Sequence, residues 1–291
     1  MKSARSSLNR FVEKLKGNTF RDWVKYFTWI FLIGYALLSL FPFAWMVSIS
    51  FKTQGKTFQW PPRLLPSQPT IQHYLKVWSV VPFGRWLLNS LLVTIVVVLG
   101  NALFASMAGF VFARLDFPLK EIIFYALLGS LMIPGQITLI PKFITMKWLG
   151  WVDTYPGIFV PKLVTVFSIF LMRQFFQSIP ESLVDTARID GCSYYRVFWN
   201  IMLPLAKPAL AAVAIYQFMG AWNGFMWPLI IAQTPEMFTL PVGLAYFQNQ
   251  YYTFWGKQMA AATIMSIPTV LIFIMFQKQF TEGIHFSGIK G

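Results

Sequence analysis

Few residues of this sequence have the types and spacing that catalysis needs. Gly55, Lys56 and Thr57 end like a phosphate-binding loop, whose backbone amides and lysine hold a nucleotide. Ser50 stands where such a loop requires its first glycine, so we interpret the match as a coincidence. The chain has one cysteine, two distant histidines, and no paired acid and base or metal-ligand cluster. We therefore predict no catalytic residue, no metal site and no cofactor in this chain.

The composition indicates that water is not the main solvent of this protein. Of its 291 residues, 56% are hydrophobic and 12% are charged, whereas a soluble domain has roughly 25% charged residues. The formal net charge of +14 would suit nucleic-acid binding if the basic residues were gathered to contact phosphates. Several apolar runs, however, reach the ~20 residues that cross a bilayer. The distribution of the charges decides between these two interpretations.

Six apolar runs predict six transmembrane helices. A helix satisfies every backbone polar group internally, as lipid requires, and the sequence lacks the alternating short strands of a barrel. The expected fold class is therefore an all-α polytopic membrane protein. The predicted spans are residues 26–49, 87–113, 122–144, 156–172, 209–232 and 259–276.

Basic residues near the spans predict the orientation, because Lys and Arg are retained on the cytoplasmic side. Residues 1–25 form a basic amphipathic leader suited to the inner membrane surface, and six crossings then put both termini in the cytoplasm. Most of the net charge is thus topological, and we predict a lipid bilayer and no nucleic acid as partner. Residues 26–291 form the membrane domain, with a cytoplasmic loop at 173–208 and external loops at 51–85, 145–155 and 233–257.

The most informative segment is residues 178–208, which is too polar to lie in hydrocarbon. Ser178 and Glu181 have the spacing of a capping box, so a helix is predicted to begin there. Gly191 suits the left-handed residue at which such a helix ends. Ser193 is predicted to cap a second helix over 194–202, which Pro204 stops. We expect two short helices joined at a glycine, on the cytoplasmic side.

One side of the first short helix carries Ile179, Leu183 and Ala187, while acidic and basic residues lie elsewhere around it. Such an apolar stripe fits a groove on another protein. It equally fits a loop helix that packs on its own membrane domain. The periodicity leaves both interpretations open.

The segment 180–208 resembles the EAA loop of binding-protein-dependent ABC importers. Asp185, Thr186 and Ala187 take the place of the Glu-Ala-Ala triplet, followed by Gly191 and by the closing Ile201-x-Leu203-Pro204. Asp185 shortens the glutamate of the motif, and Thr186 replaces an alanine. Both changes keep the charge or the approximate size, so the match holds.

The resemblance extends over nearly the whole chain and points to the maltose-type, carbohydrate class of these permeases. The segments that carry it are Asn89-Ser90, residues 109–118, residues 132–141, residues 221–229 and the end of the chain at 283–291. It implies a MetI-like permease subunit of a bacterial-type cytoplasmic (inner) membrane. It also implies a heterodimer with a second permease, two ATPase subunits that bind ATP and Mg, and an extracytoplasmic solute-binding protein that delivers a sugar, oligosaccharide or glycoside.

The resemblance further implies that the first short helix couples the membrane domain to the ATPase. The residues expected to carry this coupling are Glu181, Asp185, Thr186, Ala187, Asp190, Gly191, Ile201 and Pro204. Because the chain has no phosphate-binding loop, it is expected to be a transport subunit without enzymatic activity.

Two further sets of residues are candidates for contact with the solute and with the binding protein. Polar residues within apolar spans line a pathway or bond a neighbouring helix, and their type leaves both possibilities open. The pathway candidates are Gln136, Thr138, Gln217 and Asn223, with Asn101 as a further polar residue in a span. An external loop rich in rings faces either the binding protein or the lipid interface. Its residues are Tyr246, Phe247, Tyr251, Tyr252 and Trp255.

Two further features of the spans also carry expectations. Gly220 and Gly224 have the spacing of a close helix contact, and Lys162 is expected to extend toward the membrane surface.

An ABC permease for a phosphate ester or a polyamine is the alternative function with the same architecture. An ion-coupled secondary transporter would need acidic residues inside the spans, and a membrane channel or enzyme would need a site that this sequence does not display.

Overall fold

The computed structural model describes residues 2–57, 59–247 and 254–285, with side chains described for 23–53, 55–57, 59–247 and 254–277. The described residues form helices and no strand. The longer helices are α1 (Lys2–Ser50), α2 (Gln72–Val80), α3 (Phe83–Gly100), α4 (Ser106–Arg114), α5 (Lys120–Ser130), α6 (Leu139–Trp148), α8 (Val166–Ser178), α9 (Glu181–Ile189), α12 (Lys207–Trp222) and α15 (Trp255–His285). The shorter ones are α7 (Tyr155–Phe159), α10 (Tyr194–Val197), α11 (Leu203–Leu205), α13 (Met226–Ile231) and α14 (Leu240–Tyr246).

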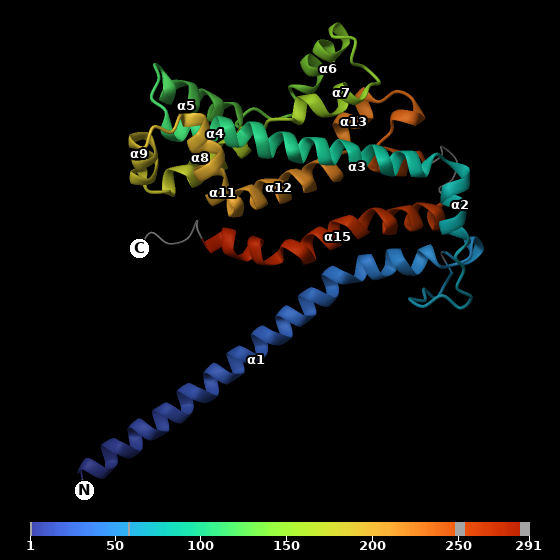
Figure 1. Ribbon diagram of the computed structural model, residues 1–291. Coiled ribbons are helices and arrows are strands. Elements are labelled where there is room, and N and C mark those ends of the chain that lie inside the picture. The colour runs from blue at the N-terminus through green and yellow to red at the C-terminus, as the bar shows by residue number, and fades with distance from the viewer. Residues whose placement is uncertain (1, 58, 248–253, 286–291) are drawn as a thin grey trace.

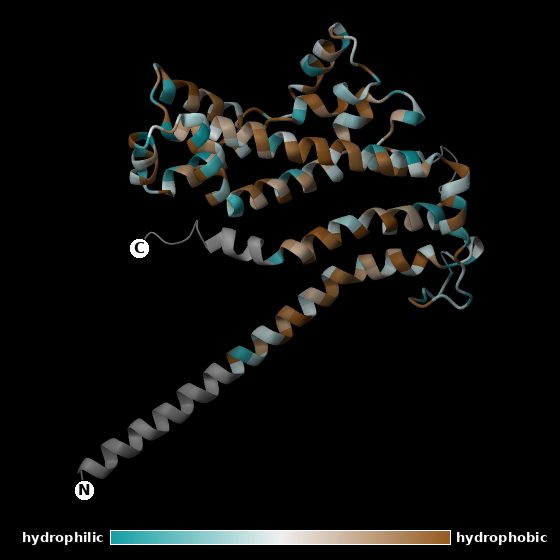
Figure 2. Ribbon diagram, in the orientation of Figure 1, coloured by the Kyte–Doolittle hydropathy of each residue, from teal (hydrophilic) through white to brown (hydrophobic). Residues whose placement is uncertain are grey.

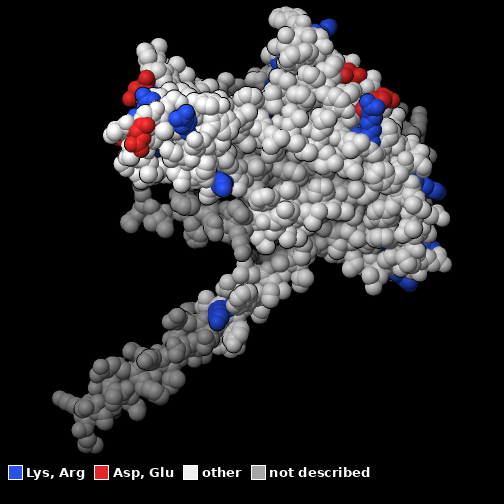
Figure 3. Space-filling model, in the orientation of Figure 1, with Lys and Arg blue, Asp and Glu red and all other residues white. Residues whose placement is uncertain are grey.

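The helices form an elongated bundle whose two ends differ in polarity from its middle. Helix α12 packs on α3 and on α15, and α15 packs on α1 (Figure 1). Helix α9 and the C-terminal end of α15 lie at one end of the bundle, and α2 lies at the other (Figure 1). Apolar residues dominate the long helices in Figure 2, and charged side chains gather at the two ends in Figure 3. This pattern is that of a protein embedded in a bilayer.

Among the described residues, four helical stretches are long and apolar enough to cross a membrane. They are Trp23–Ser50, Phe83–Arg114, Tyr155–Ser178 and Trp255–Gln277. A fifth crossing is counted if the pair Tyr194–Leu205 and Lys207–Trp222, bent by 77°, is one broken span. Length and composition thus support four or five of the six predicted crossings.

The predicted third span, 122–144, is wrong as a single helix. Helix α5 ends at Ser130 and α6 begins at Leu139, with turns between them. Pro134 lacks an amide hydrogen, and Gly135 next to it favours a turn, so the helix is interrupted there.

The predicted fifth span, 209–232, is also interrupted. Helix α12 ends at Trp222 and α13 begins only at Met226. The break falls at Asn223 and Gly224, two residues that commonly end a helix. Both interruptions therefore occur where the sequence has helix-ending residues inside an apolar run.

Helix α1 is continuous from the leader into the first span and buries almost nothing against its own bundle. None of the residues in its most apolar 18-residue window is buried, whereas 39% are buried in the corresponding window of Phe83–Arg114. Helix α1 packs mainly on α15, and it does so near the C-terminal end of α1 (Figure 1). The exposed rings and aliphatic side chains along it require lipid or another membrane protein around them.

A buried polar cluster joins three helices near the middle of the long span 83–114. The Nδ2 of Asn101 donates to the carbonyl of Lys162 at 2.7 Å, and its Oδ1 accepts from the backbone amide of Thr165 at 3.0 Å. The Nε2 of Gln217 donates to the hydroxyls of Thr165 at 2.7 Å and Ser168 at 2.8 Å. This cluster ties the centre of the span to α8 and α12.

Candidate functional site

The short helix α9 and the turn that follows it form the candidate coupling site. Helix α9 begins after Pro180 and has Glu181 in its first turn and Arg188 in its last, which suits the helix dipole. The predicted cap at Ser178 is wrong. Ser178 ends α8 and donates its hydroxyl to the carbonyl of Phe175, and Ile179 is extended, so Ser178 lies too early to reach the first amides of α9.

The end of α9 is a Schellman turn centred on Gly191. The amide of Cys192 donates to the carbonyl of Ala187 at 2.9 Å, and the amide of Gly191 donates to Arg188 at 3.1 Å. Gly191 has φ +80°, as predicted for a left-handed residue. The Oγ of Ser193 then accepts from the amide of Arg196 and caps α10, so this prediction is confirmed. The turn fixes the angle between the two short helices.

Helix α9 has one face buried in its own membrane domain and one face open. Val184 and Ala187 are buried in a cluster with Met172, Phe176 and Phe198. Leu183, expected in the apolar stripe, is 44% exposed and Val184 takes its place. The open face carries Glu181, Ser182, Leu183, Asp185, Thr186, Arg188, Ile189 and Asp190. Ile189 is 85% exposed, so the open face carries an apolar side chain as well as three carboxylates.

Two arginines that the sequence analysis did not assign to the site fix the helices around α9. Arg114 bonds the segment that leads into α9, and Arg173 ties α8 to α4 and α5. The Nη2 of Arg114, at the end of α4, donates to the carbonyl of Phe176 at 2.6 Å and also to that of Ile179. Arg173 donates from Nε to the carbonyl of Phe112 and from Nη2 to both carboxylate oxygens of Glu121, at 3.0 and 3.3 Å. Arg114 lies within the motif 109–118, which is the one signal that could have identified it.

The second short helix does not end at Pro204 as predicted. Helix α10 continues through a π-helical turn (Phe198–Met202) into α11, so Pro204 does not stop it. Proline is tolerated in the first turn of α11, and the chain bends only after Leu205. Ile201 is partly buried against the same cluster as Ala187, whereas Pro204 is exposed.

Comparison with known proteins identifies the family. The profile described as "Binding-protein-dependent transport system inner membrane component" matches residues 23–285. The chain belongs to this family. Its members are permease subunits of ABC transporters, so this chain is a transport subunit without enzymatic activity, and ATP is hydrolysed by a separate subunit.

Relatives and solved structures agree with this assignment. The arabinooligosaccharides transport system permease protein AraQ of Halalkalibacterium halodurans is 35% identical, with 91% of this chain and 97% of the relative covered. The diacetylchitobiose uptake system permease protein NgcG of Streptomyces coelicolor is 30% identical, with 87% and 85% covered. A bacterial ABC transporter chain for the import of alginate has the same fold, with a TM-score of 0.78 at 24% identity, covering 86% of this chain and 93% of that one.

The permease has a groove of about 550 Å³ between α1, α12 and α15. Its lining is mainly apolar, and Asn223, Ser266 and Thr269 are polar residues on it. Of the four pathway candidates, only Asn223 lines this groove. Gln217 is buried in the polar cluster, and Gln136 and Thr138 lie in the interruption before α6. The structure therefore does not bring the four candidates together.

The side chain of Lys162, expected to extend toward the membrane surface, points toward Gly224. The Nζ of Lys162 lies 3.0 Å from the position that a Cβ on Gly224 would occupy, beside the end of α12. Lys142 is close enough to repel it, and the Nζ of Lys142 lies 5.1 Å from the ring centre of Trp227. In the described part of the chain, neither lysine has a carboxylate within ion-pair distance. A side chain at Gly220 would meet nothing within 4 Å, so the predicted close contact at Gly220 is wrong within this chain.

The loop after α13, predicted to be external, is fixed to the start of α3. Trp86 donates from Nε1 to the carbonyl of Pro235 at 2.7 Å, and Arg85 donates from Nε to that of Glu236 at 3.0 Å. The hydroxyl of Ser90 accepts from the amide of Leu240 at 2.7 Å. Residues of the motif Asn89-Ser90 thus position this loop, which sequence reasoning had not assigned to them.

The aromatic residues of the same loop are divided between surface and core. Tyr246 is 60% exposed and Trp255 is 39% exposed, whereas Phe247 is buried against Trp86 at a ring-centre distance of 6.3 Å. The prediction that Phe247 faces outward is therefore wrong. Tyr251 and Tyr252 lie outside the described residues.

Proposed function

We propose that this chain is one of two permease subunits through which an ABC importer moves a carbohydrate-type solute delivered by a binding protein. The observation that carries the proposal is the open face of α9, held rigidly at one end of the bundle by Arg114 and by the turn at Gly191. The names of the relatives support a carbohydrate cargo, since two of them are permeases for arabinooligosaccharides and diacetylchitobiose.

The open face of α9 would dock in a cleft of an ATPase subunit that holds ATP and Mg. Closing of two ATPases around nucleotide would move α9 and convert the bundle between inward-facing and outward-facing states. Some residues are proposed to touch the ATPase, and others to position the residues that touch it. Together they are Glu181, Asp185, Thr186, Ala187, Asp190, Gly191, Ile201 and Pro204. Ala187 and Ile201 would not touch the ATPase but would anchor the hairpin of short helices in the membrane domain.

We further propose six crossings of the cytoplasmic membrane with both termini inside. The third crossing would be α5 with the interruption and α6. The shared position of α9 and the end of α15 at one end of the bundle supports an even number of crossings between these two points (Figure 1). A second, different permease would cover the open side of α1 and complete the groove.

The experiment that tests this function is reconstitution of the permease with its partner permease, ATPases and binding protein. Uptake should require the ATPases and should be blocked by vanadate. Candidate glycosides, supplied one at a time with the binding protein, should differ in how strongly they raise ATP hydrolysis. Uptake that persists without the ATPases and follows an ion gradient would contradict the proposal. The absence of acidic residues from all four span candidates argues against such a transporter.

A phosphate ester is the second candidate cargo, because Lys142 and Lys162 are both only partly exposed and have no carboxylate within ion-pair distance among the described residues. A relative named as an sn-glycerol-3-phosphate permease in Yersinia pestis, 30% identical over 89% of this chain, supports it. The same two charges would repel a polyamine. Replacing Lys162 by Met should lower uptake of an anionic solute and leave uptake of a neutral glycoside unchanged, which separates the two cargo classes.

A further inference from the structure

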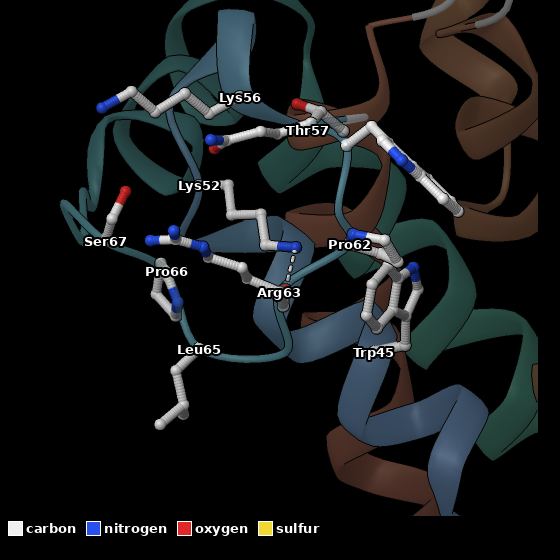
Figure 4. A pocket seen from close by; sticks show the side chains of 11 residues that line it. Trp45, Lys52, Lys56, Thr57, Pro62, Arg63, Leu65, Pro66 and Ser67 are labelled. Carbon is white, nitrogen blue, oxygen red and sulfur yellow. Dashed lines mark hydrogen bonds between the residues drawn. The ribbon is translucent and has the colours of Figure 1, made fainter.

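A small pocket lies where the first external loop folds back on the end of α1. Its volume is about 180 Å³, and its lining includes Trp45, Lys52, Lys56, Trp60 and Arg63 (Figure 4). Trp45 belongs to the last turns of α1, and Lys52 lies just beyond the end of that helix, after Phe51. With α9 on the cytoplasmic side, this pocket lies at the external surface of the membrane.

Lys52 and Ser48 fasten the loop to the end of α1. Lys52 is only 6% exposed, its Nζ donates to the carbonyl of Arg63 at 2.7 Å, and it lies 4.4 Å from the ring centre of Trp45. Ser48 donates its hydroxyl to the carbonyl of Leu64. These contacts hold Arg63 beside the helix end, and its guanidinium group points toward Ser67, away from Trp45 (Figure 4).

The pocket has a large positive charge without compensation. Lys56 donates to the neutral Oε1 of Gln68 at 3.0 Å, and the sequence has no acidic residue between Asp22 and Asp116. Within the described residues, the two recorded ion pairs, Lys120–Asp116 and Arg173–Glu121, both lie elsewhere. Basic residues are disfavoured in short external flanks, so their accumulation here requires a reason.

The surroundings of the pocket are those of the lipid interface. Trp60 is 87% exposed and Leu65 is 80% exposed, and both line the pocket together with the basic groups. Exposed tryptophan and leucine beside cations fit the headgroup region, where rings and aliphatic chains reach inward and charges stay at phosphate depth. The adjoining face of α1 is itself exposed and apolar.

We propose that this pocket binds the phosphate of an anionic phospholipid of the outer leaflet. Arg63 and Lys56 contact the phosphate oxygens, Lys52 supplies fixed positive charge behind them, and Trp60 and Leu65 lie among the upper acyl chains. Arginine suits this role because its planar donors match two phosphate oxygens at once. The inference rests on the proposed orientation of the permease and not on the identity of its cargo.

The test compares lipid binding by the intact transporter complex in nanodiscs made of phosphatidylcholine with a small share of phosphatidylglycerol. Native mass spectrometry of the released complex measures the enrichment of bound phosphatidylglycerol over phosphatidylcholine. Arg63→Gln and Lys56→Gln should each lower this enrichment about fivefold, as expected for one charge at an anionic surface. Lys76→Gln is the matched control, because Lys76 is exposed in the same external loop but does not line the pocket, and it should change nothing.

Three results would overturn the proposal. One is equal enrichment in the double variant Arg63→Gln/Lys56→Gln and in the control. Another is displacement of the lipid by inorganic phosphate, which would make the site one for a free anion. The third is unchanged lipid binding with a loss of stimulation by the binding protein, which would assign the pocket to a protein contact. Since both substituted side chains are at the surface of the loop, folding and ATP-driven uptake in pure phosphatidylcholine should persist, and failure of uptake there would concern the proposed function instead.

Discussion

Asn89, on α3, fixes the main chain of Phe238, in the loop before α14. Its Nδ2 donates to the carbonyl of Phe238 at 2.9 Å and to that of Glu236 at 2.8 Å, and its Oδ1 accepts from the hydroxyl of Tyr155 at 2.7 Å. Asn89 is 1% exposed. A single amide therefore joins the start of α3, the start of α7 and the loop before α14.

Replacing Asn89 by Leu should destabilise the packing of this loop on α3 and α7. The carbonyl of Glu236 keeps Arg85 as a donor, but the carbonyl of Phe238 and the hydroxyl of Tyr155 lose their partners. Leaving these two partly buried polar groups unpaired costs about 2 kcal/mol, at the lower end of the range for buried groups. Thermal unfolding in detergent measures the loss, and Ser90→Ala, which removes one bond to Leu240, should cost about 1 kcal/mol. Equal stability of Asn89→Leu and the wild-type protein would contradict this role.

Replacing Gly191 by Val should uncouple ATP hydrolysis from uptake. A side chain there meets nothing within 4 Å, so the cost is conformational, about 1–2 kcal/mol at φ +80°. Gly150→Val is the matched control, since Gly150 has φ +69°, equally open space and a position outside the coupling hairpin. In reconstituted transporter, Gly150→Val should keep the ratio of solute moved to ATP hydrolysed. Normal coupling in Gly191→Val would remove this turn from the mechanism.

Replacing Arg173 by Met should destabilise the packing of α8 on α4 and α5. The substitution keeps the apolar stem but leaves the carbonyl of Phe112 and the carboxylate of Glu121 without their donor. Because the side chain of Glu121 is 53% exposed and can find water, we expect about 2–3 kcal/mol, less than for a fully buried pair. The exposed pair of Lys120 with Asp116 offers the contrast, and Lys120→Gln should leave the unfolding temperature unchanged. An equal effect of both variants would be inconsistent with the anchoring role.

Asp153 should make the loop after α13 sensitive to acid. Burial raises the pKa of this carboxyl, but the amides of Thr234 and Gln233 and the hydroxyl of Thr234 bond its charged form and hold the pKa below its ordinary value of 3.8. The stabilisation is present above the ordinary pKa of the unfolded chain and is lost as the pH falls through the lower folded value. Hydrogen exchange at Gln233 and Thr234 should therefore accelerate on acidification below about pH 4, beyond the intrinsic change. Asp153→Asn should show the faster exchange already at neutral pH.

The sequence predicted the class of fold because hydrophobic length is a local property. The four described span candidates begin and end within a few residues of four predicted spans. The two interruptions, at Pro134 and at Asn223, had visible signals in the residues themselves. Their effect depended on whether neighbouring helices satisfy the freed backbone groups, which one segment alone does not reveal.

The candidate site was predictable in its turn and less so in its surroundings. Gly191 and Ser193 act through backbone groups a few residues away, so their roles follow from spacing. Val184 in place of Leu183 depends on where the membrane domain lies relative to α9, and Arg114 reaches Phe176 across a sequence separation of 62 residues. Contacts of that range leave no periodic signal in a single sequence.

The polar cluster of Asn101, Thr165 and Gln217 restricts which parts of this subunit can deform. Each of its hydrogen bonds, once broken in hydrocarbon, would find no water to replace it. We therefore expect the long span, α8 and α12 to move as one rigid body when the transporter changes conformation. Bending should occur in the two segments where the helices are interrupted, at 131–138 and at 223–225. The gate of the permease should accordingly be sought in these two segments and not at the polar cluster.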